Sequence, residues 1–187
     1  MKKLLLAVVV SAGFCSTATM ASAGNVKFLG SVMAATCNLE AVQTSGVGFA
    51  TPNVIQFGTV ATNSSTSVDF SLQPVAGTPN KTNCDDIFAP APSRLGLSKA
   101  DIQWVGIFDA AGTAFQNTAG TATDSTVGIA SNGTTSGSHS VSLANQVLNF
   151  VAADYNADNG FKHKATLNAG ATPGSFDTVL SYLVTYN

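Results

Sequence analysis

The side chains that most often carry out chemistry in proteins are scarce in this sequence. Its two histidines, His139 and His163, are too few for a copper–zinc centre of the superoxide dismutase kind. His163 stands between Lys162 and Lys164 in an alternating segment, so we expect it on the surface of a strand. Serine and threonine are plentiful, but no Gly-x-Ser-x-Gly elbow or Ser-His-Asp arrangement stands out. The sequence therefore predicts no enzyme, no metal site and no cofactor.

The remaining candidates for a site each have a structural interpretation that is favoured. Asp85 and Asp86 could touch a cation, but a solvated loop is the favoured interpretation of this adjacent acidic pair. Trp104 could face a sugar, whereas its apolar neighbours favour a place in the core. Tyr182 and Tyr186 could serve recognition, but packing is the favoured role for tyrosines in a strand.

The N-terminus has the pattern of a secretory signal peptide. Two lysines precede an unbroken apolar run over residues 4–10, and the small residues at 21–23 form a cleavage site. We expect residues 1–23 to be the signal peptide, with cleavage after Ala18 as the alternative. Cys15 leaves with the signal, and 164 of the 187 residues remain. That length suits one domain with a real core.

The charge balance excludes one class of partner. Charged residues make up 10% of the chain, against about 25% in an ordinary soluble domain. Without the two lysines of the signal, six basic residues stand against ten acidic ones, and no basic patch is present. Nucleic acid is therefore not expected as a partner. The shortage of charge suits a surface that packs against copies of itself.

Two cysteines, Cys37 and Cys84, remain in the chain after the signal. A signal peptide implies an oxidising compartment, so one disulfide bond between them is expected, with two free thiols as the alternative. The bond would close a loop of about 47 residues, and the chain-entropy model gives about 4 kcal/mol of stabilisation for such a loop.

The hydrophobic pattern predicts an all-β protein. Apolar residues alternate with period two in many short segments, and clusters of Gly, Pro, Asn and Ser separate them, which favours a β-sandwich. We expect strands near residues 54–60, 68–72, 104–108, 126–130, 147–155, 161–167 and 178–186. Residues 98–100 are predicted to form one helical turn, and residues 74–92 and 113–140 to be mainly surface loops.

Two segments have to be considered together. The first lies at the start of the expected mature chain and places five residues on one side of a strand, namely Val26, Phe28, Gly30, Val32 and Ala34. The second is the last strand, which places four residues on one face, namely Leu180, Tyr182, Val184 and Tyr186. An open apolar sheet edge would aggregate, and a free N-terminal strand needs an edge to join. Both needs are met if the first segment of one copy inserts beside the last strand of another.

Ordered sequence features carry a resemblance to a known family. The alternating N-terminal segment with its glycine precedes Cys37, and Phe57-Gly58-Thr59-Val60 follows. An alternating strand then leads to Cys84, a Val-Gly strand ends in Asp109-Ala110-Ala111-Gly112, and the penultimate residue is Tyr186. In this order, over the whole mature chain, the sequence resembles the chaperone–usher pilins of the type 1 and P fimbrial group. Residues 73–83 are extra relative to that pattern and are expected to form an added loop.

The resemblance implies a fold and a mode of assembly. The fold would be an incomplete immunoglobulin-like β-sandwich that lacks its last, seventh strand, with residues 24–36 as donor-strand extension and residues 37–187 as pilin domain. Phe28 and Val32 would fill pockets of a neighbour's groove, and Gly30 would lie where no side chain fits. The C-terminal strand would border the acceptor groove and bind the chaperone.

The same resemblance implies partners and a location. The partners would be identical or related pilin subunits, a periplasmic chaperone, an outer-membrane usher and a host-surface receptor. The protein would be exported through the periplasm to the cell surface as a structural subunit of a fimbria, polymerising by donor-strand exchange and supporting adhesion. The alternative function is a single-domain adhesive subunit that binds a receptor through residues 113–140.

Overall fold

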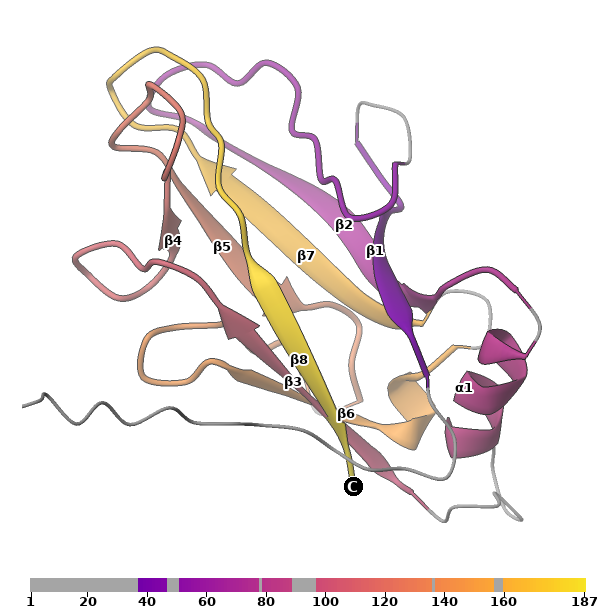
Figure 1. Ribbon diagram of the computed structural model, residues 1–187. Helices are drawn as coiled ribbons and strands as arrows, with labels where there is room; N and C mark the ends of the chain where they lie inside the picture. Colours follow the sequence, from indigo (N-terminus) through magenta and orange to yellow (C-terminus); the bar gives the residue numbers. More distant parts are fainter. Residues whose placement is uncertain (1–36, 47–50, 78, 89–96, 136, 157–159) are drawn as a thin grey trace, which may run out of the picture. The chain divides into compact units, whose positions relative to one another are not determined.

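The computed structural model describes residues 37–46, 51–77, 79–88, 97–135, 137–156 and 160–187. The expected signal peptide and donor strand lie outside these residues. Within them the chain is almost entirely β-structure (Figure 1). The elements in chain order are β1 (Leu39–Gln43), β2 (Ser65–Pro74), α1 (Asn80–Phe88), β3 (Lys99–Val105), β4 (Phe115–Gln116), β5 (Thr126–Ser131), β6 (Val147–Val151), the 3₁₀ turn η1 (Ala152–Asp154), β7 (Phe161–Asn168) and β8 (Ser181–Tyr186).

The strands form two antiparallel sheets that pack face to face. One sheet has five strands in the order β1-β2-β7-β5-β4, and the other has three in the order β6-β3-β8. Aromatic rings connect the two sheets, because Phe70 of β2 lies 5.9 Å from Trp104 of β3, and Phe150 of β6 lies 5.1 Å from Phe161 of β7. The predicted all-β sandwich is therefore confirmed.

Alternation of side chains builds the core from short strands. In β7 the side chains of Phe161, His163, Ala165 and Leu167 are buried, while Lys162 and its alternate neighbours point outward. The same period buries Val68, Phe70 and Leu72 in β2, and Ala100, Ile102 and Trp104 in β3. Trp104 thus lies in the core, as predicted.

The prediction that His163 lies on the surface is wrong. Its side chain is fully buried, since the alternation that turns Lys162 and Lys164 outward turns His163 inward. The imidazole stacks on Phe70 at 5.1 Å between ring centroids and lies 5.5 Å from the ring of Trp104. The period of the strand, rather than the polar character of histidine, decides the position of this side chain.

Several predicted boundaries are corrected by the structure. Residues 54–60 belong to no strand of either sheet, although a buried strand was expected there. The helical turn expected at residues 98–100 is absent, because Lys99 and Ala100 belong to β3 and pair there with β6 and β8. The last strand begins at Ser181 rather than at residue 178. The strand expected near residues 126–130 is confirmed as β5.

Helix α1 lies in a segment for which a surface loop was expected. Its residues have weak helix propensity, so tertiary contacts must hold it. Cys84 forms the predicted disulfide with Cys37, and Ile87 is fully buried. Asp85 accepts a hydrogen bond from Lys81 at 3.1 Å and another from the Tyr155 hydroxyl at 2.9 Å. In the described part of the chain, no helix has the length and apolarity needed to span a bilayer.

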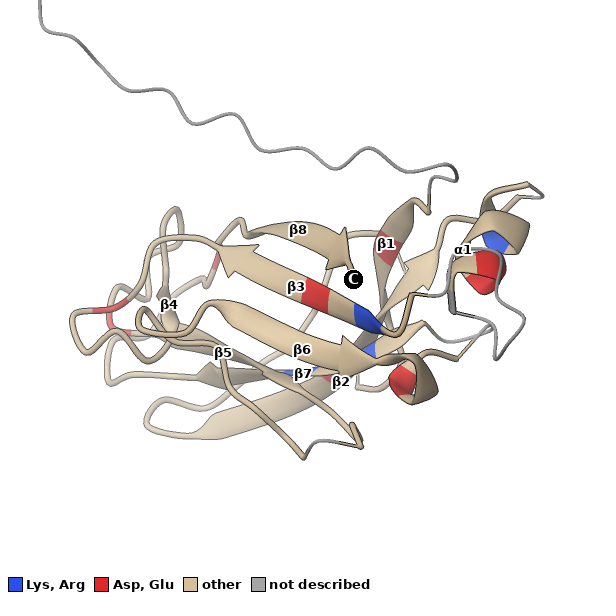
Figure 2. Cartoon of the chain, turned by 90° about the horizontal axis from the view of Figure 1, so that it is seen from below, with Lys and Arg blue, Asp and Glu red and all other residues tan. Residues whose placement is uncertain are grey.

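The outer face of the three-stranded sheet carries little charge (Figure 2). Strands β6 and β8 contain no charged residue, and β3 contributes Lys99 and Asp101. The Asp101 carboxylate accepts hydrogen bonds from the amides of Asn149 and Asn187 at 2.6 and 2.7 Å. Val105, which is 48% exposed, continues this face as an apolar surface.

Candidate functional site

One edge of the three-stranded sheet is open along β8. Lys99 and Asn187 exchange both backbone hydrogen bonds, so every second residue of β8 from there faces β3. The backbone N–H and C=O groups of Tyr182 and Val184 therefore point away from β3. Among the described residues, no further strand pairs with that side of β8. The edge can accept the hydrogen bonds of one more strand.

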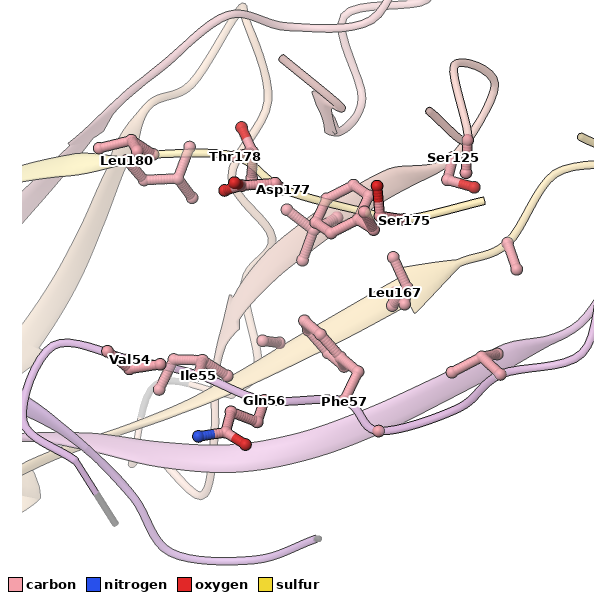
Figure 3. Close-up of a pocket in the computed structure, with 18 of the residues that line it drawn as sticks. Val54, Ile55, Gln56, Phe57, Ser125, Leu167, Ser175, Asp177, Thr178 and Leu180 are labelled. Atoms are coloured by element: carbon pink, nitrogen blue, oxygen red, sulfur yellow. The ribbon is translucent and has the colours of Figure 1, made fainter. Parts of the chain in front are cut away.

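A groove of about 800 Å³ opens along part of this edge. Residues 53–60 form one side and residues 172–182 the other, and Figure 3 shows Ile55 and Phe57 on the first side, Thr178 and Leu180 on the second and Leu167 between them. The floor consists of core side chains from both sheets, including Phe70, Trp104, Val127, Ile129, Ala165 and Leu167. The groove therefore has an apolar floor between the two sheets.

The first side of the groove is tied to β1 rather than to a strand partner. Asn53 donates its backbone N–H to the carbonyl of Ala41 at 2.7 Å, and its side-chain oxygen accepts the N–H of Ala41 at 3.0 Å. The side chain of Gln43 accepts from the N–H of Gln56 at 2.7 Å and donates to its carbonyl at 3.1 Å. These bonds occupy the outer edge of β1 and hold residues 53–57 as a rim. We call residues 53–60 the β1-side rim.

The far end of the opposite side depends on one asparagine. Asn117 donates to the carbonyls of Ala122 and Ser175 at 2.8 and 3.0 Å and accepts from the N–H groups of Gly120 and Asp177 at 2.8 and 3.0 Å. All four hydrogen-bonding positions of its amide are used. Gly120 permits the close approach, because a Cβ there would overlap the carbonyl oxygen of Ser175. Asn117 therefore fixes the backbone of residues 175–177 where the groove ends.

Two tyrosines of β8 close the other end. The Tyr182 hydroxyl donates to the carbonyl of Leu39 at 2.8 Å, and the Tyr186 hydroxyl donates to the carbonyl of Cys37 at 3.4 Å. Burial, and then the charge of Glu40, raises the pKa of Tyr182. Burial, and then Tyr182, raises the pKa of Tyr186. Both phenols therefore remain protonated donors near neutral pH and connect the two sheets.

The structure brings part of the predicted C-terminal set to the groove. Leu180 and Tyr182 line it, and the lining described by the structure ends at Tyr182. Val184 and Tyr186 lie on the same face of β8 and pack against the core beyond that end. The five residues predicted for the donor strand lie outside the described residues.

Sequence reasoning missed both the β1-side rim and the role of Asn117. The rim carries an alternating apolar pattern, in which Ile55 and Phe57 are partly buried, and this pattern also describes a paired strand. The signal that could have separated the two is the Pro52-Asn53 turn and Gly58, both of which have turn-type backbones in the structure, with φ of 61° at Asn53 and 71° at Gly58.

The groove offers backbone hydrogen bonds and apolar surface rather than reactive groups. No cluster of three or more His, Cys, Asp or Glu side chains that could hold a metal ion occurs within the described residues. An open strand edge above an apolar floor is the arrangement that accepts an extended chain with alternating apolar side chains. The site is therefore suited to binding a strand.

Comparison with known proteins shows the family of the chain. No family model matches the sequence. The chain is 35% identical over 187 residues to the F107 fimbrial protein of Escherichia coli, covering 100% of this chain and 99% of that protein. Among solved structures, the P pilus rod subunit PapA aligns with 81% of this chain and 100% of its own at 13% identity, with a TM-score of 0.38. The full-length relationship to the F107 protein shows that this chain belongs to the family of bacterial fimbrial proteins and is a structural subunit rather than an enzyme.

Proposed function

We propose that this protein is a subunit of a cell-surface fimbria and polymerises by accepting the N-terminal strand of another copy in its groove. The observation that carries the proposal is the open edge of β8 beside a groove with an apolar floor. Family membership supports the fimbria, and the groove supports the mode of assembly. Residues 26–34 of a second copy are the proposed occupant, since their alternating apolar pattern matches an apolar floor.

The attachment point of residues 26–34 favours another copy over the same chain. Cys37 lies at the Tyr186 end of β8, where its carbonyl accepts the Tyr186 hydroxyl. To pair antiparallel with its own β8, a chain would have to place Ala34 near Leu180. Three residue steps from Ala34 to Cys37 reach about 10 Å, whereas the six steps from Leu180 to Tyr186 span about 20 Å. The chain's own segment can pair only in the less stable parallel sense, and a neighbour's segment is free to pair antiparallel.

The energy of such an insertion is large on the scale of a domain. Burying one large apolar side chain yields about 1.5–3 kcal/mol, so three or four give about 5–10 kcal/mol before ordering costs. Each ladder hydrogen bond adds about 0.5–1.5 kcal/mol. A whole domain has a net stability of about 5–15 kcal/mol. Filling the groove is therefore comparable to a folding step, and the isolated subunit is expected to be weakly stable or self-associating.

Further partners follow from the exposed groove and the expected signal peptide. A subunit exported with its core surface open would aggregate unless another protein covered it first. We assign that role to a periplasmic chaperone, with an outer-membrane usher as the place of exchange. The low-charge outer face of β3, β6 and β8 would then contact other subunits within the fibre, and the finished fibre would support adhesion to a host surface.

Two complementary variants test the proposal. Deleting residues 24–34 should give a subunit that accepts a strand but cannot donate one, and Leu180→Asp should give one that donates but cannot accept. Each alone should fail to polymerise, while a mixture should form a dimer that resists SDS without boiling and grows no further. Gly30→Leu should block polymerisation while chaperone binding persists.

Leu143→Asp is the matched control for the groove variant. Leu143 is 61% exposed and does not line the groove, whereas the side chain of Leu180 is partly buried and lines it. The control should polymerise as the wild type does, giving a ladder of SDS-resistant oligomers. Long fibres from the deletion variant would refute the donor assignment, and equal polymerisation of the Leu180 and Leu143 variants would refute the acceptor assignment.

A further inference from the structure

The side chain of Tyr182 contacts both the groove and the opposite sheet. Its side chain lines the groove beside β8, where its ring lies 5.6 Å from that of Trp104. Its hydroxyl reaches across to the other sheet and donates to the carbonyl of Leu39 at 2.8 Å. Leu39 opens β1, only two residues after Cys37. One side chain therefore contacts both the proposed acceptor groove and the first residues of the described chain, which follow the proposed donor segment.

Residues 37–39 are held from two directions. We call residues 37–39 the root, because the proposed donor segment is attached there. On one side, Cys37 is bonded to Cys84 of α1, and the backbone of Asn38 exchanges two hydrogen bonds with the side chain of Asn80, at 2.8 and 2.9 Å. On the other side, two hydroxyls of β8 hold it: that of Tyr182 donates to the carbonyl of Leu39 at 2.8 Å, and that of Tyr186 donates to the carbonyl of Cys37 at 3.4 Å.

Only the second of these attachments can respond to the groove. Neither Asn80 nor Cys84 lines the groove, whereas Tyr182 does. Strand β8 is an edge strand among the described residues, paired with β3 on one side. Edge strands open locally more readily than central ones, and a partner on the free side adds hydrogen bonds that suppress this opening. A change in the mobility of β8 reaches the root through these two hydroxyls, and of the two tyrosines only Tyr182 lines the groove.

We propose that Tyr182 couples the two assembly sites of one subunit, so that filling its groove orders the root of its own donor segment. The coupling rests on the proposed function, since it requires a strand in the groove and a donor segment ahead of Cys37. Coupling through reduced mobility needs no change of shape. It is also reciprocal, so a subunit whose donor segment is held by a neighbour accepts the next strand more tightly. A subunit that has already accepted a strand becomes the better donor.

Hydrogen exchange on the full mature chain tests the coupling. A synthetic peptide of residues 24–36, added in saturating excess, fills the groove and keeps the chain monomeric. In the wild type the peptide should slow amide exchange at residues 38–43 by about tenfold, within the range typical of coupled sites. In Tyr182→Phe, which removes only the hydroxyl, the peptide-induced slowing should fall below about twofold. Peptide binding is measured separately for each variant, so that saturation holds throughout.

Asn80→Ala provides the matched control on the other attachment of the root. This variant should speed exchange at residues 38–43 with and without peptide, and the peptide-induced slowing should persist. A purely structural role for Tyr182 predicts the same behaviour for Tyr182→Phe, so equal peptide-induced slowing in wild type and Tyr182→Phe would overturn the coupling alone. Failure of the peptide to bind the wild type at all would overturn the proposed function, and the coupling with it.

Discussion

The buried imidazole of His163 should make the stability of this protein depend on pH above the range in which its carboxylates titrate. Burial lowers the pKa of His163 from 6.5 to about 4, and the hydrogen bond to the Phe161 carbonyl offsets part of this effect. Because a carbonyl only accepts, Nδ1 carries the proton of that 2.9 Å bond. Nε2 has no hydrogen-bond partner among the described residues. Protonation would therefore place an unpaired charge in an aromatic core.

The sign and size of the effect follow from linkage. Between about pH 6.5 and pH 4 the unfolded chain holds a proton on His163 that the folded chain does not. The free energy of unfolding should therefore fall by up to about 1.4 kcal/mol per pH unit as the pH drops, or by about 3 kcal/mol in all. Above pH 6.5 this loss is absent, and below pH 4 the folded state binds the proton as well, so His163 causes no further loss.

Other acid-sensitive groups act in a lower range. Burial alone would raise the pKa of Asp109, Asp124 and Asp154, but hydrogen bonds from neighbouring loops outweigh it and hold each pKa below 3.8. Their contribution to stability is present above that pH and is lost only as the pH falls further. Of these four groups, His163 is therefore the one whose effect falls mainly between pH 7 and pH 4.5.

The assay is urea unfolding of the purified subunit, followed by Trp104 fluorescence at several pH values between 7 and 4.5. A saturating peptide of residues 24–36 keeps groove occupancy constant, and its single ionisable side chain, Lys27, does not titrate in this range. His163→Phe should abolish the dependence on pH, and the same substitution at the exposed His139 should leave it unchanged. Equal losses of stability in wild type and His163→Phe would refute the reasoning.

Two further predictions concern stability and the groove. Replacing Cys37 and Cys84 together by serine should lower the free energy of unfolding by about 4 kcal/mol, since a bond that closes 47 residues is lost; urea unfolding without reductant measures this, and a change below about 1 kcal/mol would contradict it. Gly106→Ala should cost about 1–3 kcal/mol and weaken peptide binding, because its Cβ would lie 2.5 Å from Leu180 at the groove. Gly128→Ala, whose Cβ meets only ordinary contacts, is the control for both measurements, and equal behaviour of the two alanine variants would count against the packing argument.

Period-two alternation predicted those strands that bury one face against the core. It located β2, β5 and β7 and the buried faces of Phe70 and Leu72, because a half-buried strand can be read from the sequence alone. The disulfide bond between the two cysteines was also predicted correctly, because the signal-peptide pattern at the N-terminus implies an oxidising compartment. These features depend on short-range pattern or on residue identity.

The features that failed depend on contacts distant in the sequence. Helix α1 has no helical pattern of its own, and it is held by Cys84 and Ile87, whose partners lie elsewhere in the fold. The β1-side rim has the apolar pattern of a strand, yet its backbone forms hydrogen bonds with the carbonyl of Ala41 and the side chain of Gln43 instead of with a neighbouring strand. A pattern of apolar residues cannot distinguish a segment that pairs with a neighbouring strand from one that only forms the side of a groove.

The position of Trp104 gives the molecule a built-in optical probe. The chain has one tryptophan, which is 4% exposed and forms part of the groove floor. Its indole emission should change when a strand excludes water from that floor, so every subunit would register the occupation of its own groove. Fibre growth could then be followed in real time on unlabelled protein, one signal for each junction made.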